Sequence, residues 1–192
     1  MAYKIFIDLM HQDEKLGKEL SKKLERAGAE VLPLENSDDK DFKIKLKSGL
    51  RQADEVILFL TPNSLDSQKL FYDMGVAAAL KKPVTTVLHG VETKDLPRLV
   101  NETIYIKYSE IGQYLSKLRE KASAPEGESE KIKVDRMKKA LRSEKFTWRS
   151  IKTLADVGGV LESEALNILR NDPDVVLGSG KSGARLAKLK DR

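Results

Sequence analysis

The sequence predicts an α/β protein, in which a doubly wound sheet of five parallel strands is followed by a small α+β domain. Apolar runs of strand length alternate with helical stripes over residues 1–121. Residues 122–130 contain small and acidic side chains with one Pro and one Gly, a composition typical of a linker. Residues 131–192 combine helical stripes with two strand-like runs. We therefore expect domains at 1–121 and 131–192, joined by a linker at 122–130.

In the first domain, apolar runs predict the strands and apolar stripes predict the helices between them. The expected strands are residues 4–7, 30–34, 55–60, 83–88 and 103–106. The helical stripes are Leu16, Leu20 and Leu24; Phe42, Leu46 and Leu50; Leu70, Met74, Ala77 and Ala78; and Ile111, Tyr114, Leu115 and Leu118. Gly28 is placed to end the first helix, and Pro33 indicates an edge strand. The uninterrupted apolar run in 55–60 predicts a central strand covered on both faces.

This alternation predicts the flavodoxin-like strand order 2-1-3-4-5. In sheets of that order, ligands bind outside the carboxyl ends of the strands, between the first and third strands. The segments expected there are residues 8–11, 61–64 and 67–73. Topology alone therefore predicts a ligand crevice lined by these three segments.

Composition excludes several classes of chemistry. The chain has no Cys, which excludes disulfides and thiol catalysis and fits a reducing compartment. Its two His residues, His11 and His89, are too few for an ordinary His-rich metal site, so we expect no metal. No apolar run approaches the ~20 residues of a membrane span, and no signal peptide is visible. We expect a cytoplasmic protein with no membrane partner.

Positive charge is concentrated in the second domain. Residues 1–122 carry 20 Lys and Arg against 19 Asp and Glu, whereas residues 131–192 carry 15 against 8. An excess confined to one domain indicates an anionic partner for that domain, and an ordinary solvated surface is the alternative interpretation.

Four sequence blocks resemble those of a bacterial-type TIR (Toll/interleukin-1 receptor) domain, and the resemblance covers about residues 3–120. The first is FIDLMHQD at 6–13, which resembles the opening strand and turn. The second, LRQADEVILFLTPNS at 50–64, resembles the third-strand block. The others are FYDMGVAAA at 71–79 and KPV at 82–84, which resemble the Tyr-Glu-Leu-Gly block and the fourth strand.

The resemblance implies recognition of a nucleotide such as NAD, and in some members cleavage of its nicotinamide–ribose bond. The family's catalytic Glu corresponds to Asp73, which would stabilise positive charge on the ribose. The resemblance and the predicted crevice together give these ligand-binding candidates: Phe6, Asp8, Leu9, Met10, Thr61, Ser64 and Lys69. NAD would be a substrate or ligand, with no tightly bound cofactor. A signalling or defence role and a homo-oligomer are also implied.

The sequence departs from the family pattern at several of these positions. Asp73 is one methylene shorter than Glu, Lys69 stands where the family often has Trp, and Leu9-Met10 replaces a polar pair. The loop at 35–41 lacks the usual Gly-Asp turn. Other interpretations stay open: Asp73 as an exposed helical carboxylate, Asp8 as a capping residue of the following loop, and the domain as a non-enzymatic assembly module.

The second domain is expected to contain three helices and a hairpin. The first stripe is Val134, Met137, Lys138 and Leu141. Thr147 is the candidate N-cap of a helix over 148–155, ended by Gly158-Gly159, and a third helix begins at Glu162 or Ser163. The strands 175–177 and 185–189 flank the tip GSGKSG at 178–183. This tip is not a phosphate-binding loop, because Val175 occupies the required upstream Gly position and no helix follows.

This order of elements resembles a winged helix-turn-helix domain, whose third helix enters the major groove of DNA. The resemblance and the positions of polar residues give these nucleic-acid-binding candidates: Ser163, Asn167, Arg170, Lys181, Arg185 and Lys188. Glu162 and Glu164 at the start of the third helix would repel phosphates. Protein recognition or dimerisation is the rival role of this domain, and a DNA-binding regulator is the corresponding alternative for the whole chain.

Overall fold

The computed structural model describes residues 2–32, 48–98, 100, 103–123, 130–143, 146–180 and 183–191. The chain divides into an N-terminal unit, residues 1–124, and a C-terminal unit, residues 125–192. The division falls within the stretch for which the sequence predicts a linker. The predicted stripe at Phe42 and Leu46, Pro33, and the loop 35–41 lie outside the described residues.

Five parallel strands form the sheet of the N-terminal unit, in the order β2-β1-β3-β4-β5. Their bounds are β1 Tyr3–Asp8, β2 Ala29–Val31, β3 Glu55–Leu60, β4 Val84–Leu88 and β5 Ile104–Lys107. Asp8, the last residue of β1, lies opposite Leu58 of β3. The predicted fold class, its strand order and the edge position of the second strand are confirmed.

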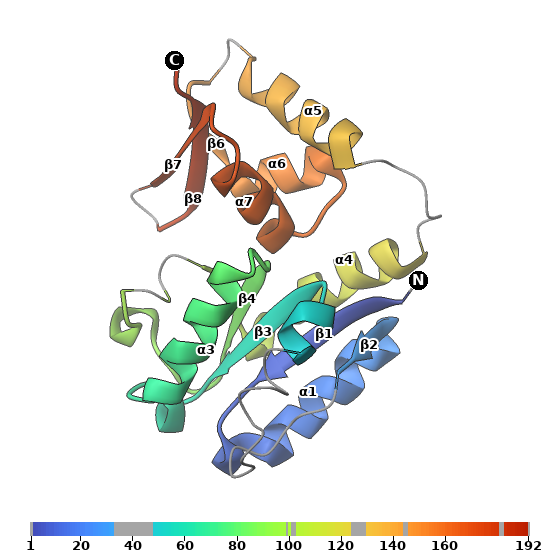
Figure 1. Ribbon diagram of the computed structural model, residues 1–192, viewed down its shortest axis with the longest axis vertical. Helices are drawn as coiled ribbons and strands as arrows, with labels where there is room; N and C mark the ends of the chain where they lie inside the picture. The colour runs from blue at the N-terminus through green and yellow to red at the C-terminus, as the bar shows by residue number, and fades with distance from the viewer. Residues whose placement is uncertain are drawn as a thin grey trace. The chain divides into compact units, whose positions relative to one another are not determined.

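Helices cover both faces of this sheet, with α1 and α3 on opposite sides (Figure 1). The helices are α1 Glu14–Arg26, α3 Gln68–Ala79 and α4 Gly112–Ser123, and the short 3-10 turns are η1 His11–Asp13, η2 Pro62–Ser64, η3 Thr93–Asp95 and η5 Tyr108–Glu110. Leu70 and Met74 of α3 pack against Leu58 and Leu60 of β3. Side chains of α3 also pack with Phe6, so Phe6 and Asp8, two residues apart on β1, both face α3.

A fully buried carboxyl group ties the opposite end of the sheet together. Glu55, the first residue of β3, accepts hydrogen bonds from three hydroxyl groups. Thr85 of β4 donates over 2.6 Å, Tyr114 of α4 over 2.8 Å and Tyr3 of β1 over 3.3 Å. One side chain thus joins the two neighbouring strands to a helix, a role that a short apolar run does not reveal.

The C-terminal unit has three helices and an antiparallel sheet of order β6-β8-β7. Its elements are α5 Glu130–Leu141, β6 Arg149–Ser150, α6 Ile151–Gly158, α7 Glu162–Arg170, β7 Val175–Ser179 and β8 Arg185–Leu189. Met137, Leu154 and Leu169, one from each helix, are fully buried, as is Ala187 of β8. The small α+β unit is therefore present, and its winged-helix identity stays a prediction.

The predicted start of the second helix in this unit is wrong. Ser150, not Thr147, caps α6, and its hydroxyl accepts a hydrogen bond from the backbone N–H of Thr153 over 3.1 Å. The reason is strand pairing: Arg149 and Ser150 pair with β8, which keeps the chain extended where a helix was expected. The helix ends as predicted, because Gly159 adopts φ +66° in the left-handed region that favours glycine.

Among the helices that the structure describes, none is long and apolar enough to span a membrane.

Candidate functional site

One lysine joins two buried carboxyl groups at the carboxyl end of β1. The Nζ atom of Lys69 lies 2.8 Å from Oδ1 of Asp8 and 2.7 Å from Oδ2 of Asp73. Both are hydrogen bonds as well as ion pairs. We call Asp8, Lys69 and Asp73 the carboxylate cluster.

Local structure brings the three residues together. Lys69 and Asp73 stand four residues apart on α3 and therefore on one face of that helix. Ser67 caps α3, since its hydroxyl accepts from the backbone N–H of Leu70 over 3.3 Å. Asp8 ends β1 on the sheet face that α3 covers. The cluster thus lies at the carboxyl end of β1, beside β3, where the strand order reverses and where the sequence predicts the crevice.

Each carboxyl group of the cluster has one buried oxygen that is not bonded to Lys69. Asp8 is 3% exposed and Asp73 2%, and Oδ2 of Asp8 and Oδ1 of Asp73 accept no hydrogen bond from any other described residue. Buried polar atoms are seldom left without a partner, because water can no longer satisfy them. The Lys69 side chain, 23% exposed, is the part of the cluster that reaches solvent. Asp8 and Asp73 also interact with each other through a side-chain hydrogen bond, so the two carboxyl groups can share one proton.

The cluster holds two carboxyl groups for one ammonium group. Burial, and then the negative charge of Asp73, raise the pKa of Asp8 to about 7, against the lowering effect of Lys69. Burial also raises the pKa of Asp73, although Lys69 opposes this. Burial favours the neutral form of Lys69, but the two carboxylates outweigh that effect and raise its pKa. Near neutral pH the site can therefore exchange a proton or accept a second cationic group.

Another buried carboxyl group joins the turns after β1 and β3, which we call the rim of the site, and site prediction from the sequence missed it. Asp13, 3% exposed, accepts hydrogen bonds from the Thr61 hydroxyl over 2.6 Å and from the Asn63 side-chain amide over 3.0 Å. Ser64 completes a capping box with Thr61 at η2. The turns after β1 and β3 are thereby joined. The only sequence signal for Asp13 was its place at the end of the first family-like block.

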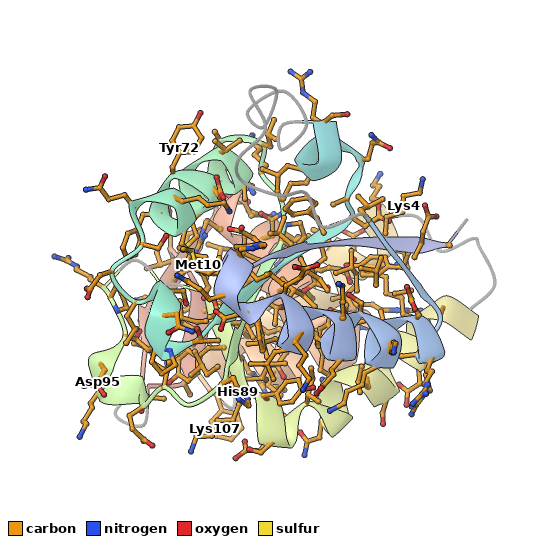
Figure 2. The ribbon with its side chains drawn as sticks, turned by 90° about the horizontal axis from the view of Figure 1, so that it is seen from below. Lys4, Met10, Tyr72, His89, Asp95 and Lys107 are labelled. Atoms are coloured by element: carbon orange, nitrogen blue, oxygen red, sulfur yellow. The ribbon has the colours of Figure 1, made fainter. Side chains whose placement is uncertain are left out.

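The other predicted ligand residues have varied surroundings. Phe6 is buried in a core cluster with Leu32 and Leu50. Leu9 and Met10 are half-buried in the turn after β1, where Figure 2 labels Met10. Thr61 and Ser64 form hydrogen bonds within the rim, as described above. Asp8 bonds Lys69 rather than capping a turn, and Asp73 is buried rather than exposed.

The two histidines contact residues outside the carboxylate cluster. His89, after β4, stacks edge-on against Tyr108 with ring centroids 5.3 Å apart. His11 lies beside Glu14 on the surface. Among the described residues, no group of three or more His, Cys, Asp or Glu side chains is arranged to hold a metal ion.

The nucleic-acid-binding candidates of the C-terminal unit are spread over two elements. On α7, Ser163 is buried, Asn167 is half-buried and Arg170 is exposed. On β8, Arg185 donates to the Ser179 hydroxyl over 2.9 Å, and the Lys188 ammonium lies 5.3 Å from the centroid of the Trp148 ring. Lys181 lies outside the described residues. Because Ser163 is buried, a nucleic acid could not contact its side chain directly.

The fold and the carboxylate cluster define a doubly wound α/β domain with a polar site at the reversal of its strand order. A family model described as "TIR domain" matches residues 5–120, and the chain belongs to this family. The family-level resemblance seen in the sequence is thereby confirmed. A search of curated proteins found no match.

Solved structures are similar to the chain over a comparable span. A Clostridium botulinum CMP N-glycosidase, BcmB, is 26% identical, with a TM-score of 0.46, covering 60% of this chain and 96% of its own. A 2-deoxyribosyltransferase from Bacillus psychrosaccharolyticus is 15% identical, with a TM-score of 0.44, covering 64% and 93%. A metazoan TIR-STING receptor from C. gigas, solved with 2',3'-cGAMP, is 17% identical, with a TM-score of 0.47, covering 65% and 40%.

Proposed function

We propose that the N-terminal unit binds NAD or a related nucleotide at the carboxylate cluster and hydrolyses its nicotinamide–ribose bond. The observation that carries the proposal is the carboxylate cluster itself, in which buried Asp8 and Asp73 share the ammonium group of Lys69 at the carboxyl end of β1. Ribose presents hydroxyl donors at the spacing of neighbouring carbons, and carboxylates are strong acceptors for them. Membership of the TIR domain family adds support for the class of ligand.

Charge favours a substrate whose reacting centre is positive. Two carboxylates against the single ammonium of Lys69 leave one negative charge when both are ionised. The nicotinamide ring of NAD carries a positive charge, and the ribose gains positive charge as the bond to the ring breaks. A buried carboxylate stabilises such positive charge far better than water does, because its negative charge is already held in position before the bond breaks.

The reaction we propose is a hydrolysis without a cofactor. The bond between C1′ of the ribose and the ring nitrogen breaks, and its electron pair goes to nicotinamide, which leaves as a neutral molecule. Asp73 stabilises the ribosyl cation, and Asp8 holds a ribose hydroxyl. Water then adds to C1′, and the proton that it loses passes to solvent. Lys69 favours the ionised form of Asp73, against the effect of burial.

The test is release of nicotinamide by the full chain, with matched variants. We expect ADP-ribose and nicotinamide to form in equal amounts, at high protein concentration and under conditions that favour assembly. Asp73→Asn removes the charge with little change in shape and should lower the rate by about a hundredfold or more. Asp66→Asn, at an exposed position beside α3, should leave the rate unchanged. Equal rates for wild type and Asp73→Asn would contradict the proposal.

Binding can be measured apart from turnover by thermal shift. A ligand that binds the folded state raises the apparent melting temperature by mass action. A shift with NAD or ADP-ribose that Asp73→Ala abolishes, without nicotinamide release, would favour a recognition domain over an enzyme. No shift with any nucleotide would favour the assembly module, in which Asp73 has no ligand role.

A second function is proposed for the C-terminal unit, which would contact duplex DNA and so attach the N-terminal unit to it. Residues 131–192 carry 15 basic residues against 8 acidic ones, and this positive charge favours DNA contact. The exposed position of Arg170 on α7 favours it as well. We expect duplex binding that weakens as salt rises and that is reduced in Arg170→Ala. No binding at low salt would contradict it.

A further inference from the structure

An indole ring lies across the outer face of the small antiparallel sheet. Ala187 of β8 is fully buried against the helices, so its neighbours Leu186 and Lys188 point to the opposite, outer face. Trp148 precedes β6 and, by the register of β6 with β8, stands beside Lys188. Its ring belongs to the outer face together with Lys188.

The ring lies directly on the backbone of a glycine. A Cβ atom added to Gly178 of β7 would be 2.9 Å from two carbons of the Trp148 ring, closer than real Cβ contacts come. The absence of a side chain at this position therefore lets the ring reach across β8 and settle on β7. Trp148 nevertheless remains 39% exposed, which is unusual for a large aromatic ring with such support.

A positive charge accompanies the exposed ring. The Nζ atom of Lys188 lies 5.3 Å from the ring centroid, within the range of cation–π attraction. The surrounding unit has an excess of basic residues, 15 against 8 over residues 131–192. We call Trp148, Gly178 and Lys188 the Trp148 surface. It combines an aromatic ring, which contacts β7 at Gly178, with a cation that lies over the ring.

These features match the chemistry of a nucleotide strand. A nucleobase offers a flat ring that stacks on indole, and the phosphate next to it offers the charge that Lys188 would meet. Bases inside a duplex are stacked on one another and are not free to stack on an indole ring that belongs to a sheet surface. The complementarity therefore favours a single strand over a duplex, and an anionic partner over an apolar one.

We infer that the Trp148 surface binds single-stranded nucleic acid, with one base stacked on Trp148 and a neighbouring phosphate paired with Lys188. This site is separate from the carboxylate cluster and does not depend on the proposed hydrolysis. It differs also from the duplex contact proposed for α7, because it uses the outer face of the sheet.

Trp148 is the only tryptophan in the chain, so its fluorescence reports on this surface alone. The experiment uses the full chain and a labelled thymidine oligonucleotide of about 12 nucleotides, a length in the range that such surfaces cover. We expect the oligonucleotide to quench Trp148 fluorescence as it binds, with the same midpoint in quenching and in anisotropy of the label. We expect binding to weaken as salt rises.

Variants separate stacking from charge. Trp148→Leu should weaken binding by about tenfold or more, whereas Trp148→Phe, which keeps a flat ring, should lose much less. Lys188→Ala should weaken binding several-fold and reduce its salt dependence. Lys152→Ala removes an exposed cation on α6 and should change nothing. Thermal melts of each variant identify any that fail to fold, and Trp148→Phe and Lys188→Ala keep the test valid if Trp148→Leu is one of them.

Several results would overturn the inference. Heparin that binds as tightly as the oligonucleotide would show that charge alone acts. A duplex that binds without altering Trp148 fluorescence, while the single strand does not bind, would place nucleic acid elsewhere. Fluorescence that changes with protein concentration alone would assign the surface to self-association. Absence of binding at low salt would exclude a nucleic-acid site.

Discussion

Lys69 and Asp73 stand one helical turn apart on α3 and are joined by a contact of 2.7 Å. The negative charge of the candidate catalytic carboxylate is therefore balanced by a cation on the same helix. Asp8 of β1 shares the same ammonium group at 2.8 Å. The family often has Trp where this chain has Lys69. The substitution places a cation where it can lower the pKa of both carboxyl groups, and this makes the ionisation of the site depend on one side chain.

Replacing Lys69 with Met should shift the pH dependence of the proposed hydrolysis. The ammonium lowers the pKa of Asp73 and of Asp8 in the wild-type protein, so its loss raises both. Because the reaction needs ionised Asp73, the rising limb of the rate against pH should move to higher pH in Lys69→Met. Lys15→Met, at an exposed position on α1, serves as the control. A pH profile identical to that of wild type would contradict this role of Lys69.

Asp8→Asn should make the protein more stable above neutral pH and change little in acid. The pKa of Asp8 is raised from 3.8 to about 7, mainly by burial, so the folded state holds this proton more tightly than the unfolded state. Stability from this group is fully present below about pH 4 and is lost as the pH rises through about 7. The loss amounts to at most about 4 kcal/mol, since one pKa unit corresponds to about 1.4 kcal/mol.

Urea denaturation of wild type and Asp8→Asn across this pH range measures the difference. The free energy of unfolding of the variant should exceed that of wild type by an amount that grows between about pH 4 and about pH 7. A constant difference would mean that Asp8 does not titrate in this range. Asp73 and Lys69, the charged groups bonded within the cluster, are unchanged in both proteins.

The sequence predicts the framework of the site but not its internal contacts. The alternation of apolar runs and helical stripes predicts the strand order, and the ends of β1 and β3 then locate the site that holds Asp8 and Asp73. The Lys69 bridge depends on how closely α3 packs on β1, which no sequence periodicity encodes. The capping error at Thr147 has a similar cause, because pairing of Arg149 and Ser150 with β8 is a tertiary contact.

Asp13→Ala should destabilise the rim of the site. The change leaves the Thr61 hydroxyl, and the Asn63 amide, without the buried acceptor that now binds them at 2.6 and 3.0 Å. An unsatisfied buried group costs about 1–3 kcal/mol, so we expect a lower melting temperature and weaker ligand binding together. Asp13→Asn keeps one carbonyl oxygen and should have a smaller effect. Full ligand affinity in Asp13→Ala would show that the rim does not position the site.

Glu55→Leu should destabilise the N-terminal unit, although it places an apolar side chain at a fully buried position. Leucine is close to glutamate in size, but it accepts no hydrogen bond, and the hydroxyl groups of Thr85, Tyr114 and Tyr3 would lose their shared acceptor. We expect a loss of roughly 2–5 kcal/mol in the free energy of unfolding, because several buried hydroxyl groups lose this acceptor. The double variant Glu55→Leu with Thr85→Val removes both the acceptor and one donor. It should recover part of the loss, because the buried donor that lacked a partner is gone. Denaturation curves of the single and double variants give the coupling directly, and a double variant that is no more stable than Glu55→Leu alone would show that the Thr85 bond contributes nothing.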